Sequence, residues 1–317
     1  MNEIDVYNTY SNYLKDRYGE KVYKLPISLR LSCPNRDGFI SRGGCTFCGE
    51  EGGSFENLSN RLRVRQQISR NMDYIRNRYK AEKFIAYFQS FSNTYLPLEE
   101  FKEYINESIV EDIVGISIST RPDCIDDRYL EFLREVQDRH NLDITIELGL
   151  QTVNYHSLMK INRGHTLGEF IDAVMRIKKY QFRICTHLIL NLPWDSMIDV
   201  IENAKVLSAL GVDEVKLHSL YIVKGTKMAE EYERHEIQMI SKEEYMKRVI
   251  TFLEYLDPNI VIQRIIGRAP EEDTLFVNWQ ESWWKIRDEI VEMMKERKTC
   301  QGMKFNYLGG KAIKRFN

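Results

Sequence analysis

The sequence has no long apolar run. Residues 1–21 lack the hydrophobic core of a signal peptide, and no later stretch has the length that a transmembrane helix needs. The formal net charge is only −2, so any nucleic-acid binding would have to come from a local basic patch. These absences predict a cytoplasmic protein that does not enter a membrane.

Sequence repeats, low-complexity segments and a second cysteine-rich motif are also missing. The 317 residues are 43% hydrophobic and 29% charged, which allows a sizeable core beneath a soluble surface. This length is within the range of a one-domain α/β barrel. In a reducing compartment, the six cysteines indicate free, catalytic or metal-bound thiols rather than a disulfide framework.

Short apolar, β-rich runs recur, mostly about thirty residues apart, and the segments between them have the pattern of amphipathic helices. Strands that alternate with helices in this way indicate βαβ units and a parallel sheet. Six units are compatible with a partial barrel or with an open doubly wound sheet. The predicted strands cover residues 23–31, 83–91, 113–120, 142–151, 182–192 and 213–223.

Three regions are expected. Residues 1–22 form an N-terminal helical segment, residues 23–225 form the barrel, and residues 226–317 form an α-rich extension packed on it. Within the extension, residues 259–267 could add a strand and residues 278–298 read as a long helix.

Three cysteines lie in one glycine-rich loop directly after the first predicted strand. Cys33 is separated by eleven residues from Cys45, and Cys45 by two from Cys48. Thiolates select zinc or iron–sulfur groups, and a closed zinc site needs a fourth ligand that no nearby cysteine or histidine pair supplies. Three ligands without a fourth indicate a cluster with one open iron. The other cysteines have no ligand spacing and are interpreted as buried or incidental thiols: Cys124, Cys185 and Cys300.

This loop resembles the cluster-binding loop of the radical S-adenosylmethionine (radical SAM) superfamily, in which three cysteines follow the first strand of a partial (β/α)6 barrel. Phe47 fills the aromatic position before the last cysteine. The first gap is usually three residues, and the wide gap here, with "CPNRDG", is similar to one bacterial subfamily. Other segments resemble the catalytic subunit of Elongator, a radical SAM-type protein acting on tRNA wobble uridine: residues 119–125, 147–154, 161–166, 188–193 and 215–226.

The resemblance implies that Cys33, Cys45 and Cys48 hold a [4Fe–4S] cluster whose fourth iron binds SAM. Reductive cleavage of SAM then yields a 5′-deoxyadenosyl radical. The resemblance also implies cofactor contacts at the strand ends, although Asn191 replaces the glycine usual at its position. The expected cofactor-binding residues are Gln89, Ser90, Asn93, Thr94, Ser119, Glu147, Gln151 and Asn191.

Glu147 and Gln151 share a strand at even spacing, so their side chains should face the same side of the sheet. A carboxylate inside a barrel is costly unless it is paired or bound to a ligand. The catalytic residue is not identified by the sequence. The candidates are Arg163, His165, Lys216 and His218, and each could instead be a structural residue.

Residues 60–83 carry many Arg and Lys against only Asp73 and Glu82, and the C-terminal tail is also basic. With Tyr74 and Tyr79, this segment could bind phosphates and stack on bases, or be a solvated helix face. The resemblance favours tRNA as substrate, with conversion of 5-carboxymethylaminomethyl-(2-thio)uridine to 5-aminomethyl-(2-thio)uridine. It also implies an electron donor such as flavodoxin or ferredoxin, and a downstream methyltransferase.

Two alternatives remain open from the sequence. One is a radical SAM enzyme that acts on a small, tetrapyrrole-like molecule. The other is a zinc-stabilised RNA-binding protein without catalysis.

Overall fold

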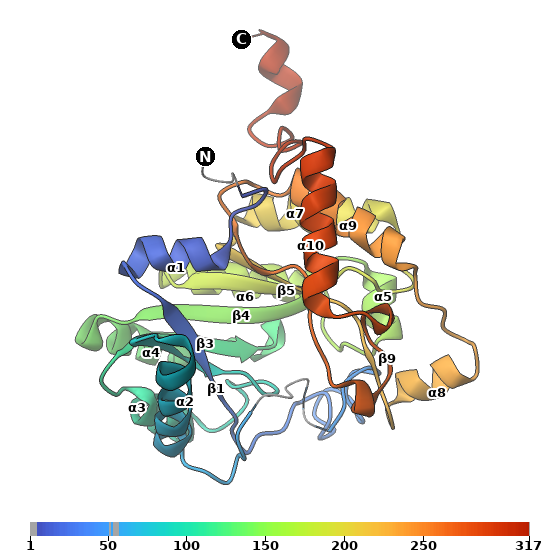
Figure 1. Ribbon diagram of the computed structural model, residues 1–317. Coiled ribbons are helices and arrows are strands. Elements are labelled where there is room, and N and C mark those ends of the chain that lie inside the picture. Colours follow the sequence, from blue (N-terminus) through green and yellow to red (C-terminus); the bar gives the residue numbers. More distant parts are fainter. Residues whose placement is uncertain (1–4, 51, 53–56, 317) are drawn as a thin grey trace.

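A curved sheet of seven parallel strands forms the centre of the molecule in the computed structural model, which describes residues 5–50, 52 and 57–316 (Figure 1). The strand order is β1-β2-β3-β4-β5-β6-β8, and it does not reverse at any point. An open doubly wound sheet would reverse its order at a switch point. The partial barrel is therefore confirmed and the doubly wound alternative is excluded. The strands are β1 Val22–Ile27, β2 Lys83–Phe88, β3 Ile113–Thr120, β4 Asp143–Gln151, β5 Arg183–Ile189, β6 Glu214–His218 and β8 Val261–Arg264. A separate antiparallel pair consists of β7 Ile222–Val223 and β9 Thr274–Phe276.

Helices between the strands pack on the outer side of the sheet, with α2 on β1, α4 on β4 and α6 on both β4 and β5. On β4, Ile144, Ile146 and Leu148 belong to the apolar core, whereas Glu147 faces the inside of the barrel. This alternation follows from the two-residue period of a strand. The helices are α1 Tyr10–Tyr18, α2 Val64–Tyr79, α3 Leu98–Ser108, α4 Asp127–His140, α5 Tyr155–Lys160, α6 Leu167–Lys179, α7 Met197–Leu210, α8 Lys227–Glu233, α9 Lys242–Tyr255 and α10 Trp283–Glu296.

The six predicted strands are present as β1 to β6, and the strand suggested for residues 259–267 is β8. Two of the predicted runs are too long: β1 ends at Ile27, and the run 213–223 is divided into β6, which ends at His218, and the short β7. Strand β8 pairs in parallel with β6, so the sheet has seven strands where the six-unit pattern predicts six. The α-rich extension thus supplies a strand of the barrel as well as helices. The boundary between residues 225 and 226 stays a prediction.

The N-terminal segment joins the two edges of the open sheet. Thr9 bridges to Ile262 of β8, and the backbone N–H of Ile262 donates to Asn8 at 2.8 Å. Helix α1 then lies against both β8 and β1. Because the edge strands would otherwise expose unpaired backbone groups, this segment protects the gap in the barrel.

Candidate active site

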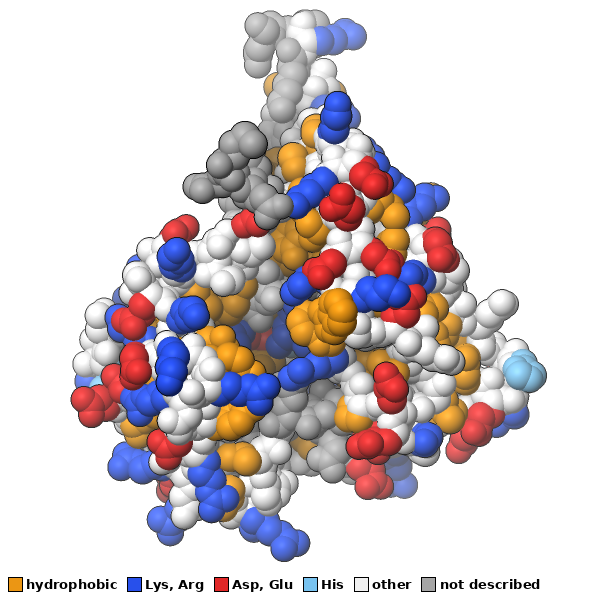
Figure 2. Space-filling view, viewed as in Figure 1, with side chains coloured by type: hydrophobic (Ala, Val, Ile, Leu, Met, Phe, Trp, Pro, Cys, Tyr) orange, Lys and Arg blue, Asp and Glu red, His pale blue; other side chains and the backbone are white. Residues whose placement is uncertain are grey.

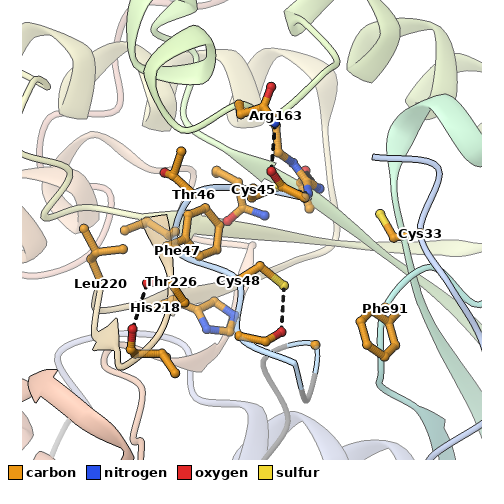
Figure 3. A pocket seen from close by; sticks show the side chains of 18 of the residues that line it. Cys33, Cys45, Thr46, Phe47, Cys48, Phe91, Arg163, His218, Leu220 and Thr226 are labelled. Atoms are coloured by element: carbon orange, nitrogen blue, oxygen red, sulfur yellow. Dashed lines mark hydrogen bonds between the residues drawn. The ribbon is translucent and has the colours of Figure 1, made fainter. Parts of the chain in front are cut away.

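A cavity of about 980 Å³ opens at the carboxyl ends of the strands. It is lined by the cysteine loop, which we define as residues 32–50, by the ends of β2 to β6, and by residues 218–227. In barrels, active sites are built at this end of the strands. Figure 3 shows Cys33, Cys45 and Cys48 around the same open space, with Phe47 beside them.

The thiols of the cysteine loop do not form a compact set of three metal-type donors in this structure. Among the described residues, Glu147, Cys185 and His187 form the only set whose three ligand atoms lie within 4.8 Å of one another. Burial raises the pKa of the Cys48 thiol to about 11, with Cys45 adding to this and Arg36 opposing it.

The eleven residues between Cys33 and Cys45 form a compact turn that is tied to the loop before α6. Asn35 is buried, and its side-chain amide donates to the carbonyl of Asn162 at 2.5 Å and approaches the Cys45 Sγ at 3.7 Å. Asn162 in turn donates to the carbonyl of Gly44 at 2.8 Å. The insertion thus holds the second cysteine in place.

Arg36, from the same insertion, fixes the other end of the cysteine loop. Its guanidinium donates to the carbonyls of Cys48 at 3.2 Å and Gly49 at 3.0 Å, and it lies over the ring of Phe91. The carbonyl of Gly49 also accepts from the backbone N–H of Gly52 at 3.2 Å, so Arg36 gives it a second donor and satisfies the carbonyl of Cys48.

The "NRGHT" segment owes its position to a helix cap. Thr166 and Glu169 form a capping box at the start of α6, which fixes the chain just before the helix. Arg163 then reaches back to donate to the Cys45 Sγ at 3.5 Å and to the carbonyl of Gly149 at 2.7 Å. Burial, with Arg163 nearby, lowers the pKa of His165 to about 2, so this imidazole stays neutral.

The inner end of the cavity is a buried polar network centred on Glu147. The carboxylate is fully buried and accepts hydrogen bonds from Lys24, from Ser117 at 2.6 Å and from His187 at 2.7 Å. Lys216 completes the set at 3.3 Å. These donors come from β1, β3, β5 and β6, so one carboxylate connects four other strands of the barrel. The surrounding cations hold the pKa of Glu147 well below its usual range although burial opposes this.

Most of the residues predicted from the sequence line this cavity. They are Cys33, Cys45, Cys48, Gln89, Ser119, Glu147, Gln151, Arg163, Lys216 and His218. Gln151 reaches it through a β-bulge at the end of β4, where its φ is +74°.

Five predicted residues are not among those that line the cavity, and their side chains are engaged elsewhere. Asn93 donates to the carbonyls of Ser90 and Ser119, at 3.0 and 2.8 Å. Asn191 bonds to both backbone groups of Leu220. The five are Ser90, Asn93, Thr94, His165 and Asn191. The cofactor contacts of Ser90, Asn93, Thr94 and Asn191 and the catalytic role of His165 stay predictions. Their hydrogen bonds favour a structural role, although the Oδ1 of Asn93 is buried without a partner among the described residues.

Sequence reasoning missed several residues of the cavity wall. Tyr87 lines the cavity and accepts from Lys216 at 2.7 Å, and Lys24, behind the wall, donates to Glu147. A lysine within an apolar strand run was the available signal for Lys24, because such a side chain must find a buried partner. Arg121 forms an ion pair at the end of its strand, since two of its nitrogens donate to the carboxylate of Asp123. Its third nitrogen, Nη1, is buried without a partner in the described part of the chain.

The basic segment forms α2 and its approach, and Figure 2 shows Lys and Arg side chains over this part of the molecule. Part of its charge is already compensated, since Arg76 pairs with Glu82 and Asp112. Tyr79 stacks on Tyr23, whereas Tyr74 is exposed.

No helix in the described part of the chain combines the length and the apolar character needed to cross a membrane.

Comparison with known proteins identifies the family. Residues 38–207 match the model of the radical SAM superfamily, and residues 212–296 match that of the radical SAM C-terminal domain. The chain is 35% identical to the protein YtqA of Bacillus subtilis, over 95% of this chain and 94% of that protein. It is 27% identical to the tRNA uridine(34) acetyltransferase of Methanocaldococcus jannaschii, over 52% of this chain and 30% of that protein.

Among solved structures, the Elp3 protein of Methanocaldococcus infernus superposes with a TM-score of 0.68 at 15% identity. The match covers 89% of this chain and 64% of that one, and at this identity it shows a shared fold. The fold, the cysteine loop and the family models agree, and the chain belongs to the radical SAM superfamily of enzymes.

Proposed function

We propose that this protein binds a [4Fe–4S] cluster through Cys33, Cys45 and Cys48, and SAM at the remaining iron. The three cysteines line one cavity, and the sequence supplies no nearby fourth ligand of the kind that a closed zinc site needs. Hydrogen-bond donors that can stabilise the negative charge of such a group are in place, because Asn35 and Arg163 direct N–H groups at the Cys45 Sγ. When bound, the cluster supplies the electron that cleaves SAM into methionine and a 5′-deoxyadenosyl radical.

The residues around this site then have defined tasks. Arg163 and Asn35 orient Cys45, and the unpartnered Nη1 of Arg121 offers a further buried donor. Gln89, Ser119 and Gln151 line the wall where the resemblance expects contacts to SAM. A cavity enclosed by strand ends also keeps water and stray hydrogen donors from the reacting atoms. A flavodoxin or ferredoxin would deliver the electron.

The substrate that we propose is tRNA, at the 5-substituent of the wobble uridine. The single observation that carries this step is the similarity over half of the chain to a protein named for tRNA uridine 34. The basic approach to α2 and the exposed Tyr74 are compatible with an RNA backbone and an unpaired base. A methyltransferase would act on the product amine.

The proposed reaction removes the carboxymethyl group from 5-carboxymethylaminomethyl-(2-thio)uridine. One hydrogen atom and one further electron leave the carbon beside the amine, and water then cleaves the C–N bond. The products are 5-aminomethyl-(2-thio)uridine and glyoxylate. SAM would be the oxidant, since the abstracted hydrogen would end in 5′-deoxyadenosine and the bound cluster could accept the electron.

Two measurements test this proposal. Anaerobically purified protein should contain iron and sulfide and should release 5′-deoxyadenosine with SAM and dithionite, and C33A, C45A or C48A should abolish the release. Stoichiometric zinc in place of iron after reconstitution would refute the cluster. Mass spectrometry of wobble nucleosides from a deletion strain tests the substrate, and a nucleoside profile identical to that of the parent strain contradicts the tRNA role.

A further inference from the structure

The inner end of the cavity carries more positive than negative charge. We define the barrel floor as Lys24, Tyr87, Glu147, His187, Lys216, His218 and Arg264. Three of these residues are cationic, and Glu147 is the one carboxylate among them. The next carboxylate, Glu214, is already bound by Arg183 at 2.8 Å and by Gln263 at 2.5 Å.

The two histidines of the barrel floor do not change its net charge. Burial lowers the pKa of His187 to about 4 and that of His218 well below its usual value, so both imidazoles are neutral near pH 7. Lys24 and Lys216 share the carboxylate of Glu147, and Arg264 adds a third positive charge to the floor without a carboxylate of its own among the described residues. Such charge is costly where water is excluded, unless an anion joins it.

Arg264 is the cation of the barrel floor that lacks a negatively charged partner among the described residues, and its Nε is buried without a hydrogen bond. Its Nη2 instead donates to the Nδ1 of His218 at 2.5 Å. Since His218 lines the cavity, this contact brings the guanidinium charge up against the cavity wall.

Lys216 presents a free donor at the same wall. Its ammonium is largely buried, lines the cavity, and donates to the Tyr87 hydroxyl at 2.7 Å and to Glu147 at 3.3 Å. An ammonium carries three donors, so one N–H remains for a ligand. Burial lowers the pKa of Lys216 to about 8 against the pull of Glu147, and an anion would stabilise its charged form.

A metal ion fits this place poorly although three metal-type donors lie together there. Glu147, Cys185 and His187 have their ligand atoms within 4.8 Å of one another. However, Lys24 and Lys216 already bind the carboxylate of Glu147, so a cation would have to displace two ammonium groups. The charge of the floor therefore selects an anion.

We propose that the barrel floor is an anion subsite that receives a carboxylate of the substrate, with Lys216 as its direct donor and Arg264 acting through His218. This inference rests on the proposed function and deepens it, because the group to be removed from the wobble substituent ends in a carboxylate. Binding that carboxylate would point the adjacent carbon out of the floor, towards the cysteine loop.

Calorimetric titration of the reconstituted full-length protein with two nucleosides tests the subsite. The nucleosides are 5-carboxymethylaminomethyluridine and 5-aminomethyluridine, which differ by the carboxymethyl group. The native protein should bind the carboxylate nucleoside at least tenfold more tightly. K216M should lose this preference, K216R should retain it, and R264Q should reduce it. K102M, on the exposed side of α3, is the matched control and should leave it unchanged.

Equal affinity of the native protein for the two nucleosides, or a full preference in K216M, would overturn the subsite. Circular dichroism checks the fold of each variant, and R264Q provides the test if K216M does not fold. The nucleoside profile of the deletion strain separates the two proposals. If that profile is unchanged, the tRNA role falls, and thermal shifts with acetate decide the subsite alone. Acetate that stabilises the native protein but not K216M supports it, whereas no effect on either, or an effect of inorganic phosphate only, refutes it.

Discussion

Replacement of Glu147 by glutamine should destabilise the protein far more than the loss of one carboxylate usually does. Glu147 is fully buried and accepts from Lys24, Ser117, His187 and Lys216, each on a different strand. Glutamine keeps the size of the side chain but removes the charge and turns an amide N–H₂ towards donors. Two ammonium groups then lose their buried counter-ion.

Breaking a buried ion pair by removing one partner costs about 3–5 kcal/mol, because the other charge remains buried. We expect a loss of this size in the free energy of unfolding of E147Q, measured by urea denaturation of identically prepared samples. E99Q removes a carboxylate of the exposed Lys102–Glu99 pair on α3 and should cost less than about 1 kcal/mol. The double variant E147Q/K216M should regain about 1–3 kcal/mol of what E147Q loses. If E147Q costs no more than E99Q, the network around Glu147 is not the electrostatic centre of the barrel.

Three further predictions concern the glycine beside the cysteine loop and the titration of the floor. G164A should cost several-fold more stability in thermal or urea unfolding than G225A. Both glycines have a positive φ, which costs about 1–2 kcal/mol for alanine. Only at Gly164 would the new Cβ also meet another atom closely, the Oδ1 of Asn35 at 2.5 Å. Equal losses of stability in the two variants would show that Asn35 and the insertion can move aside without cost. Burial lowers the folded-state pKa of His187 to about 4, below the usual 6.5, so unfolding takes up a proton below pH 6.5. The free energy of unfolding should therefore fall as the pH drops from 6.5 to 4.5, by about 1.4 kcal/mol per pH unit for this residue. H187Q should reduce this fall by that amount. Affinity for 5-carboxymethylaminomethyluridine should decline as the pH rises through about 8, because Lys216 loses its proton there. The groups that face Lys216 are Lys24, Tyr87, Glu147, His187, His218 and Arg264. An affinity that stays constant from pH 7 to 9.5 in titration calorimetry contradicts a charged Lys216 as the donor.

The strands and the position of the cysteine loop followed from local sequence alone. Each of the runs that became β1 to β6 is bounded by turn signals and alternates with an amphipathic helix, and such patterns depend on neighbours in the chain. Cys33, Cys45 and Cys48 were identified because their spacing and their place after a strand are local properties. The helix that follows "NRGHT" has the amphipathic pattern of the other spacers, and its capping box of Thr166 and Glu169 is a local feature that the structure revealed.

The floor of the cavity could not be read in this way. Lys24 and Lys216 are separated by 192 positions, and neither has a local pattern that names Glu147 as its partner. Their meeting depends on the curvature of the sheet, which brings β1, β4 and β6 to one interior. The seventh strand is a similar case, because the short run in the extension was compatible with a strand, but only its pairing with β6 made it part of the barrel.

The sequence by itself thus determined the parallel α/β architecture and the three thiols, since both are written in periodicity and spacing along the chain. Only the tertiary structure decided that the sheet closes as a partial barrel, that Asn35 and Arg163 donate towards Cys45, and that two lysines share one carboxylate in its floor. The physical reason is that charge balance and hydrogen bonding in a buried site are set by residues far apart in the chain, which meet only when the strands curve around a common interior.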